Sequence, residues 1–331
     1  MYGMMSVKPG GPETLERLEM PTPEPEPHQV LIRVHAAGVN FPDTLIIRDL
    51  YQHKPARPFA PGGEVAGVIE AVGSEITTFN IGDRVLSVGF HGGYVSHLVT
   101  DPVNVHRIPD TMSFEEAAAF MFTYGTSHYA LTDRAGLQKE ETLLVLGAAG
   151  GVGSAAIELG KALKARVIAA VSSEEKAAFC RSIGADETII YPRTMDRDAQ
   201  KAFGQSIKEA AGKSGVDVVY DAVGGNYSEP ALRSLAWNGR FLVVGFPAGI
   251  PAIPLNLTLL KSCQIIGVFW GNFMSRDPVR HSDHVRELMA LFELGEIAPR
   301  ISQTYPLEEA GQALRDLEDR KVQGKVVLTV A

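Results

Sequence analysis

The sequence predicts an α/β protein in which a β-rich part is joined to a doubly wound parallel sheet. From Thr142 onward, apolar strand-like runs alternate with helical stretches, which is typical of a parallel sheet covered by helices on both faces. The first hundred residues differ, because Gly and Pro interrupt short apolar runs there. The length of 331 residues is also what two domains usually need.

The β-rich part is predicted from short alternating runs. Residues 30–36 alternate like a half-buried strand, and residues 65–72 and 84–88 are similar. The Pro-rich stretch 21–28 is expected to be an exposed linker between strands.

Capping and glycine signals predict the remaining elements. Ser113 and Glu116 have capping-box spacing at the start of a helix. Ser172 and Glu175 have the same spacing before a helix that stops at Gly184. Further elements are strands at 216–221, 241–245 and 325–330, and helices at 282–295 and 307–320.

A glycine-rich turn between two buried strands indicates a dinucleotide site. The apolar run 143–146 leads into a glycine cluster, an amphipathic helix and a second apolar run at 167–171. This unit sets a pyrophosphate on a helix N-terminus. Gly150 and Gly151 let the backbone approach phosphate oxygens, and Gly153 lets the helix pack on the strand. A plain structural turn is the alternative reading. The residues expected to contact the cofactor are Ala149, Gly150, Gly151, Val152 and Gly153.

Composition excludes several classes of partner. The net charge of −8 gives no field that attracts nucleic acid or an anionic membrane. No apolar run approaches the ~20 residues of a membrane span, and the N-terminus lacks a signal-peptide core. The chain has two cysteines, which suits a reducing compartment, so a cytoplasmic location is expected.

Several stretches together resemble the medium-chain dehydrogenase/reductase family, in its zinc-free NADPH:quinone oxidoreductase branch (zeta-crystallin-like). They are NFPDTL (40–45), PGGEVAGVIEAVGSEITTFNIGDRV (61–85), AAGGVG (148–153), GADETIIYPR (184–193) and QGKVVL (323–328). The resemblance implies a GroES-like catalytic domain over 1–122, a Rossmann domain over 123–265 and a return to the catalytic domain over 266–331. It also implies an active cleft between the domains and a homodimer formed through the Rossmann sheet edges.

The zinc ligands of the zinc-dependent relatives are missing. The matching positions hold Asn40 and Gly63, and neither supplies the Cys or His that zinc prefers. His91, His97 and His106 show no ligand spacing with cysteine, and the cysteine-rich structural-zinc lobe is absent. Without a Lewis acid, the chemistry left is hydride delivery to an electron-poor acceptor: a quinone, an enone or an enoyl thioester.

The second strand of the cofactor unit favours NADPH. It ends without the acid that usually binds the ribose 2′-hydroxyl of NAD. Ser172 and Lys176 can bind a 2′-phosphate instead, and the resemblance adds Tyr191 and Arg320. The acidic residues at 174–175 stand against this, but first-turn acids also favour a helix dipole.

The resemblance places Asn40, Asp43 and Tyr51 near the nicotinamide. Asn40 can orient the ring or a substrate oxygen, and Tyr51 can donate to a developing enolate or quinol oxygen. For Asp43 a loop-orienting role is at least as expected as proton transfer. Further cofactor contacts are expected at Thr126, which matches the family, and at strand ends: Gly245, Phe246, Phe269, Trp270 and Gly271. For these aromatic residues a core role stays open.

The leading functional prediction is an NADPH-dependent quinone oxidoreductase. The quinone-reductase pattern often has a tyrosine at the position of Leu45, so an enoyl-thioester or 2-alkenal reductase is the alternative. A non-catalytic NADPH-binding protein is the alternative of another class.

Overall fold

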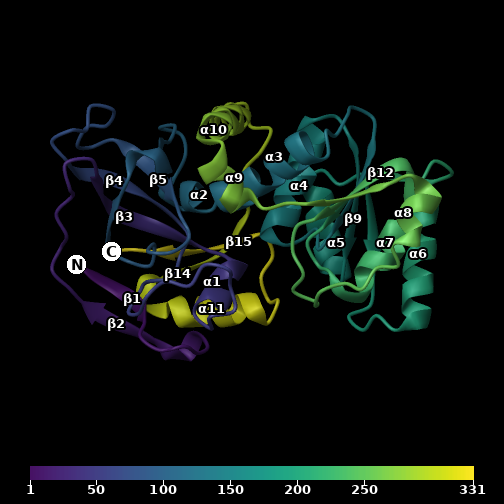
Figure 1. Ribbon diagram of the computed structural model, residues 1–331, viewed down its shortest axis with the longest axis horizontal. Helices are drawn as coiled ribbons and strands as arrows, with labels where there is room; N and C mark the ends of the chain where they lie inside the picture. Colours follow the sequence, from purple (N-terminus) through teal and green to yellow (C-terminus); the bar gives the residue numbers. More distant parts are fainter. The chain divides into compact units, whose positions relative to one another are not determined.

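The computed structural model describes all residues from 1 to 331 and divides them into two compact units (Figure 1). The first unit contains Met1–Phe122, Pro278–Met289 and Ala298–Ala331, and we call it the catalytic unit after the role that the resemblance implies. The second contains Thr123–Asp277 and Ala290–Ile297, and we call it the cofactor unit on the same ground. The sequence places the return to the catalytic domain at 266, whereas the structure places it at Pro278. The difference arises because the strand Gln264–Gly267 pairs within the cofactor sheet.

The catalytic unit is built on a mostly antiparallel seven-stranded sheet. The strands follow the order β14-β15-β3-β4-β5-β7, and β6 also pairs with β3. Their bounds are β3 (Val30–Val39), β4 (Glu64–Val72), β5 (Arg84–Val88), β6 (His97–Thr100), β7 (Val105–Arg107), β14 (Ile301–Pro306) and β15 (Lys325–Thr329). A separate hairpin-like pair consists of β1 (Tyr2–Ser6) and β2 (Leu15–Glu19).

The C-terminal strand completes this unit. β15 pairs antiparallel with β3, with Val326 opposite Val39. The pairing therefore brings Lys325, at the start of β15, beside the end of β3. The helices of the unit are α1 (Phe41–Ile46), α2 (Phe114–Ala118), α11 (Ala310–Glu318) and most of α10 (Pro278–Glu293), whose residues from Ala290 onward belong to the cofactor unit.

The cofactor unit contains a six-stranded parallel sheet in the order β10-β9-β8-β11-β12-β13. The strands are β8 (Thr142–Leu146), β9 (Arg166–Val171), β10 (Glu187–Ile190), β11 (Val216–Asp221), β12 (Leu235–Val243) and β13 (Gln264–Gly267). The chain reverses its direction of winding between β8 and β11, and ligands of open α/β sheets bind at such a switch point. The predicted fold class is confirmed.

The cofactor sheet is accompanied by α3 (Thr126–Tyr129), α4 (Gly151–Ala162), α5 (Glu174–Ser182), α6 (Arg197–Ala211), α7 (Ser228–Arg233), α8 (Asn256–Lys261) and α9 (Trp270–Arg276). Short 3-10 and π turns lie at Pro12–Thr14, Pro102–Asn104, Met121–Gly125, Ala130–Arg134, Gly225–Tyr227 and Leu307–Glu309. No helix combines the length and the apolar composition that crossing a bilayer requires.

The two capping predictions have different outcomes. The Ser113–Glu116 capping box is confirmed, because each residue bonds the backbone N–H of the other. The prediction that Ser172 caps the next helix is wrong. Ser173 is the N-cap of α5 and accepts a hydrogen bond from the Lys176 N–H. Ser172 is thus left outside the helix at the end of β9.

Candidate active site

The glycine turn after β8 has the geometry of a phosphate site. Gly147 has a φ of +70°, and Gly150 is the N-cap of α4 without any side-chain cap bond. A Cβ on Gly153 would lie 2.4 Å from the Gly147 carbonyl oxygen, so the close contact of helix and turn requires glycine there. A Cβ on Gly150 would meet only that oxygen, at 3.4 Å, which leaves space for an anion before the helix.

Buried hydroxyl groups hold the start of α4 in place. The Ser127 hydroxyl donates to the Val152 carbonyl at 2.9 Å and lies 2.9 Å from the Tyr220 hydroxyl. Ser127 directly follows Thr126, and both Ser127 and Tyr220 are fully buried. Sequence analysis missed these two residues, because a Ser in a helix and a Tyr in an apolar strand carry no distinctive pattern.

The end of β9 offers donors to a phosphate. Lys176 lies in the first turn of α5, and Ser172 follows the strand. Glu174, which could compete for a ribose hydroxyl, forms an ion pair with Arg181. Tyr191 is buried, with its ring packed against Tyr227, so its ring belongs to the core of this unit.

Arg320 belongs to the catalytic unit, where it follows α11. Its contact with the cofactor, like that of Tyr191, stays a prediction.

The loops after β11, β12 and β13 carry the other predicted contacts. Asp221 fixes the turn after β11, where its carboxylate accepts from the backbone N–H groups of Val223 and Gly224. Gly245 donates its N–H to the Asp221 carbonyl. Phe246 and Phe269 are each 47% exposed and remain available to a ligand.

Trp270 and Gly271 open α9, immediately after Phe269. Trp270 is only 3% exposed and packs on Gly125, where a Cβ would lie 2.6 Å from the indole ring. For Trp270, the core role that the sequence left open is therefore what the structure supports.

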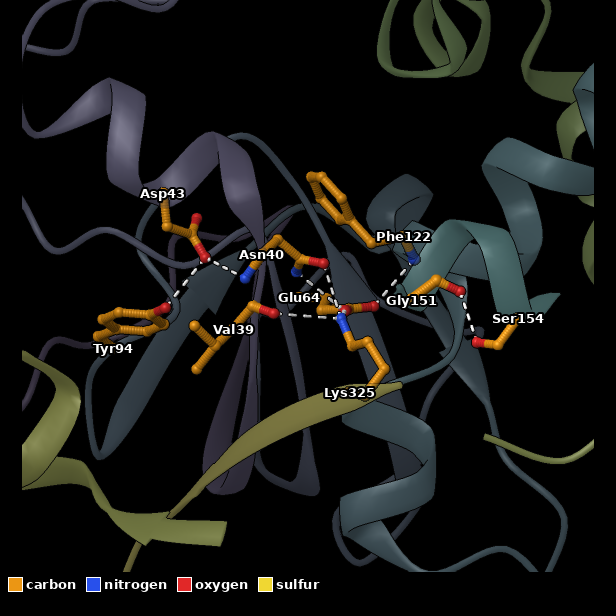
Figure 2. Close-up of polar contacts among 9 residues, drawn as sticks. All are labelled: Val39, Asn40, Asp43, Glu64, Tyr94, Phe122, Gly151, Ser154 and Lys325. Atoms are coloured by element: carbon orange, nitrogen blue, oxygen red, sulfur yellow. Dashed lines mark hydrogen bonds and ion pairs between the residues drawn. The ribbon is translucent and has the colours of Figure 1, made fainter. Parts of the chain in front are cut away.

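In the catalytic unit, Asn40 lies in a buried network of charged groups (Figure 2). Its Nδ2 donates to Glu64 Oε1 at 3.0 Å, and its Oδ1 accepts from Lys325 Nζ at 2.7 Å. Lys325 Nζ also lies 2.6 Å from Glu64 Oε1. The second carboxylate oxygen of Glu64 accepts from the Phe122 N–H at 2.9 Å. The amide of Asn40 is thus held by a cation on one side and a carboxylate on the other.

Asp43 lies in the first turn of α1 and is buried. Its Oδ2 accepts from the Asn40 N–H at 2.8 Å and from the Tyr94 hydroxyl at 2.9 Å. Burial raises the pKa of Asp43 to about 6, an effect that the two hydrogen bonds and the Lys325 charge oppose. The carboxyl can therefore change its charge near neutral pH.

Tyr51 follows α1 and packs against the core of the catalytic unit. Its hydroxyl makes no hydrogen bond within the protein, which leaves it available to a substrate. Burial, and then the charge of Asp43, raise the pKa of Tyr51, so this residue is a neutral donor at physiological pH.

The donor set around Asn40 does not fit zinc. Zinc in proteins needs three or four Cys, His or carboxylate ligands, and no group of three such side chains is arranged to hold a metal. A side chain on Gly63 would collide with the Phe122 ring, because its Cβ would lie 2.6 Å from that ring. The positive charge among these oxygens is the Lys325 ammonium.

Glu64, Tyr94 and Lys325 contact the predicted residues Asn40 and Asp43, and the sequence analysis did not single them out. A usable signal was present for two of them. Glu64 and Lys325 each open a strand and stand directly before an apolar run, and a charge in such a place is buried only when it is paired. Neither residue alone, however, indicates which partner it has.

Comparisons with known proteins agree with this fold. The zinc-binding dehydrogenase family matches residues 151–293, and the alcohol dehydrogenase GroES-like domain matches residues 26–110. Quinone oxidoreductase-like protein 2 of Bos taurus is 38% identical over 320 residues, which cover 95% of this chain and 88% of the relative.

Solved structures of related enzymes have the same fold. Escherichia coli quinone oxidoreductase, solved in complex with NADPH, has a TM-score of 0.89 at 31% identity and covers 99% of this chain and 100% of its own. The CurK enoyl reductase has a TM-score of 0.88 at 27% identity and covers 100% and 99%. Fold and site together define a medium-chain dehydrogenase/reductase. Within that class, the chain belongs to the quinone oxidoreductase family.

Proposed function

We propose that this protein transfers a hydride from NADPH to a quinone without the help of zinc. The observation that carries the proposal is the set of groups around Asn40, in which an amide bonded to the Lys325 ammonium stands where the resemblance would place a zinc ligand. Because no Lewis acid can stabilise an alkoxide there, the acceptor has to be electron-poor before it binds. A quinone meets this requirement.

In this proposal the cofactor unit binds NADPH, which supplies the hydride. The turn from Ala149 to Gly153 and the N-terminus of α4 would hold its pyrophosphate. Ser172 and Lys176 bind the 2′-phosphate, together with Tyr191 and Arg320. The residues that would bound the nicotinamide end are Thr126, Gly245, Phe246, Phe269 and Gly271, whereas Trp270 supports them from the core.

In this proposal, residues of the catalytic unit orient the acceptor and donate hydrogen bonds to its oxygen. Tyr51 donates a hydrogen bond to the oxygen on which negative charge develops, and Asn40 orients the acceptor or the nicotinamide amide. Asp43 acts on Tyr51 and Asn40 through its charge. A hydride would bring two electrons and one hydrogen to the quinone, and a single proton, from Tyr51 or from water, would then complete the neutral quinol.

An enoyl-thioester or 2-alkenal reductase is the second candidate. Two observations favour it: Leu45 stands where quinone reductases often have a tyrosine that can stack on a flat ring, and an enoyl reductase shares the fold. A protein that binds NADPH without catalysis is the third possibility.

One substrate panel separates the three candidates. NADPH oxidation is followed with 1,4-benzoquinone, 9,10-phenanthrenequinone, crotonyl-CoA and acrolein under identical conditions, with NADPH binding measured separately by fluorescence. The proposal requires the highest kcat/KM for a quinone. Preference for crotonyl-CoA or acrolein would establish the alternative reductase, and binding without turnover would establish the non-catalytic protein.

We also propose that the protein forms a homodimer through the edge of the cofactor sheet. β13 is an edge strand whose Ile265 is 37% exposed. The neighbouring α8 exposes Leu259 and Leu260 by 78% and 64%. An exposed strand edge offers unpaired N–H and C=O groups to another chain, and exposed apolar side chains beside it favour such an interface. Light scattering should give the mass of a dimer, and Ile265→Lys should give a monomer.

A further inference from the structure

The amide of Asn40 is held between two buried groups of opposite charge (Figure 2). Lys325 is 4% exposed, Glu64 is 2% exposed and Asn40 is 7% exposed. The ammonium can only donate hydrogen bonds, and the carboxylate can only accept them. A flipped amide would therefore point its N–H at the ammonium and its oxygen at the carboxylate. Only one of the two amide orientations is compatible with these neighbours.

The backbone around Lys325 is fixed from both sides. The Lys325 N–H donates to the Arg300 carbonyl at 2.7 Å, and its own carbonyl accepts from the Ser302 hydroxyl at 3.1 Å. Gly324 precedes it with a φ of +71°, and a Cβ there would lie 2.2 Å from the Arg300 carbonyl oxygen. The turn thus requires glycine, and it directs the lysine toward the end of β3.

The ammonium has no capacity left for other ligands. Its contacts are Asn40 Oδ1 at 2.7 Å, Glu64 Oε1 at 2.6 Å and the Val39 carbonyl at 3.5 Å. Asn40 Nδ2, in contrast, donates a single hydrogen bond, to Glu64. One amide N–H of Asn40 is therefore uncommitted, and its direction is set by the two charged neighbours.

We propose that Lys325 and Glu64 are positioning residues that lock the Asn40 amide, so that its uncommitted N–H binds the carbonyl oxygen of the acceptor. The proposal rests on the proposed function and adds residues that act through Asn40 without touching the acceptor. The carbonyl oxygen gains negative charge as the hydride arrives, so a donor fixed in advance stabilises the transition state more than the bound acceptor. An amide that could flip would present its oxygen to the same charge.

The alternative is that the ion pair serves only stability. Buried ion pairs can often be replaced by neutral side chains without loss of stability, whereas removal of one partner leaves an unpaired charge. The single variant Lys325→Met would therefore lose the fixed amide orientation and also leave Glu64 as an unpaired buried charge, so its kcat cannot separate the two roles. The double variant Lys325→Met/Glu64→Gln removes both charges and so leaves neither of them unpaired. It also removes the two charges that give the Asn40 amide its preferred orientation.

The test compares these variants on the best acceptor. We expect the double variant to melt at nearly the same temperature as the wild type and to keep its NADPH dissociation constant within about twofold, while kcat falls about tenfold or more. Lys325→Arg, which keeps a cation, should retain most of the turnover. Lys321→Met is the matched control, because Lys321 is a surface lysine of the same segment that pairs with Asp316 and Asp319. Wild-type kcat in the double variant would overturn the proposal.

A second measurement does not depend on turnover. The two side-chain amide protons of Asn40 can be assigned by NMR through their absence in Asn40→Ala. In the wild type we expect a widely separated pair, because only one proton bonds the carboxylate. In the double variant the separation should collapse, and an unchanged pair would contradict the locking. If the wild type reduces no acceptor, the proposed function fails while this measurement still decides the positioning.

Discussion

The Tyr94 hydroxyl donates a 2.9 Å hydrogen bond to the Asp43 carboxylate, and both side chains are buried. The same oxygen accepts the N–H of Asn40, at the start of α1. These two bonds favour the ionised carboxylate, but burial outweighs them, since the pKa of Asp43 is raised from 3.8 to about 6. The site thus holds a carboxylate whose charge costs stability at neutral pH.

Asp43→Asn should make the protein more stable at pH 8. A folded-state pKa above the unfolded value means that protonation favours folding. The contribution is present below about pH 4 and is lost as the pH rises through about 6. The difference of about two between the folded and unfolded pKa values of Asp43 corresponds to at most roughly 3 kcal/mol in the free energy of unfolding. The amide oxygen of Asn can still accept both hydrogen bonds. Denaturant unfolding at pH 8 and pH 4 should show a gain at pH 8 only, and equal gains at both values would refute the assignment.

Activity should not depend on a metal. The reasons lie at the two positions that match the zinc ligands of the zinc-dependent relatives. The Asn40 amide is hydrogen-bonded to Lys325 and Glu64, and a side chain on Gly63 would collide with the Phe122 ring. Elemental analysis of active protein should find no stoichiometric zinc, and dialysis against a chelator should leave kcat unchanged. Activity that a chelator removes and zinc restores would contradict this prediction.

NADPH should bind at least tenfold more tightly than NADH. No acidic residue lies at the end of β9, and Ser172 is not the N-cap of α5. Lys176 lies in the first turn of that helix. A hydrogen bond to a charged group contributes about 1.5–3 kcal/mol. Fluorescence titration of both cofactors measures the ratio. Lys176→Ala should weaken NADPH alone, while Lys201→Ala, on the exposed face of α6, should change neither. Equal affinities in the wild type would remove the 2′-phosphate site.

Gly151→Val should abolish NADPH binding without unfolding the chain. Gly151 is the first residue of α4, after an N-cap that has no side-chain cap bond. A branched side chain there would occupy the space that the pyrophosphate needs. The far-UV spectrum should be retained while the fluorescence titration becomes flat. Gly204→Val is the control, since a Cβ at this position in α6 meets only Pro230 at 3.7 Å. Normal binding by Gly151→Val would show that the phosphate turn lies elsewhere.

The parallel sheet could be predicted from sequence because its signals are local. Residues 142–171 contain a strand, a turn and a helix in succession, and each is indicated by a pattern among residues that are close in the sequence. The exit from this domain could not be predicted in the same way. β13 has mostly exposed residues, so it lacks the apolar pattern of a buried strand, and only its pairing with β12 assigns it to the cofactor sheet.

The charged network was largely beyond the reach of sequence reasoning. Asn40 and Asp43 were found because they lie in one short motif with a family resemblance. Lys325 is 285 residues from Asn40, and only the antiparallel pairing of β15 with β3 brings them together. A strand's register is decided by tertiary packing, so no local pattern could state that the ammonium faces this amide.

Tyr51→Phe should lower kcat while the affinity for NADPH stays nearly constant. The Tyr51 hydroxyl has no partner in the protein, and burial together with Asp43 raises its pKa, which keeps it protonated. A donor that acts on developing charge stabilises the transition state more than the bound acceptor. The expected loss is on the order of ten- to a thousandfold if this residue is the principal donor.

The effect of Tyr51→Phe should be larger with crotonyl-CoA or acrolein than with a quinone, because a quinol oxygen can take its proton from water. Tyr305→Phe, remote in sequence and hydrogen-bonded to Asp316, serves as the control. An unchanged kcat on the best acceptor would leave Asn40 and ordered water as the remaining donors.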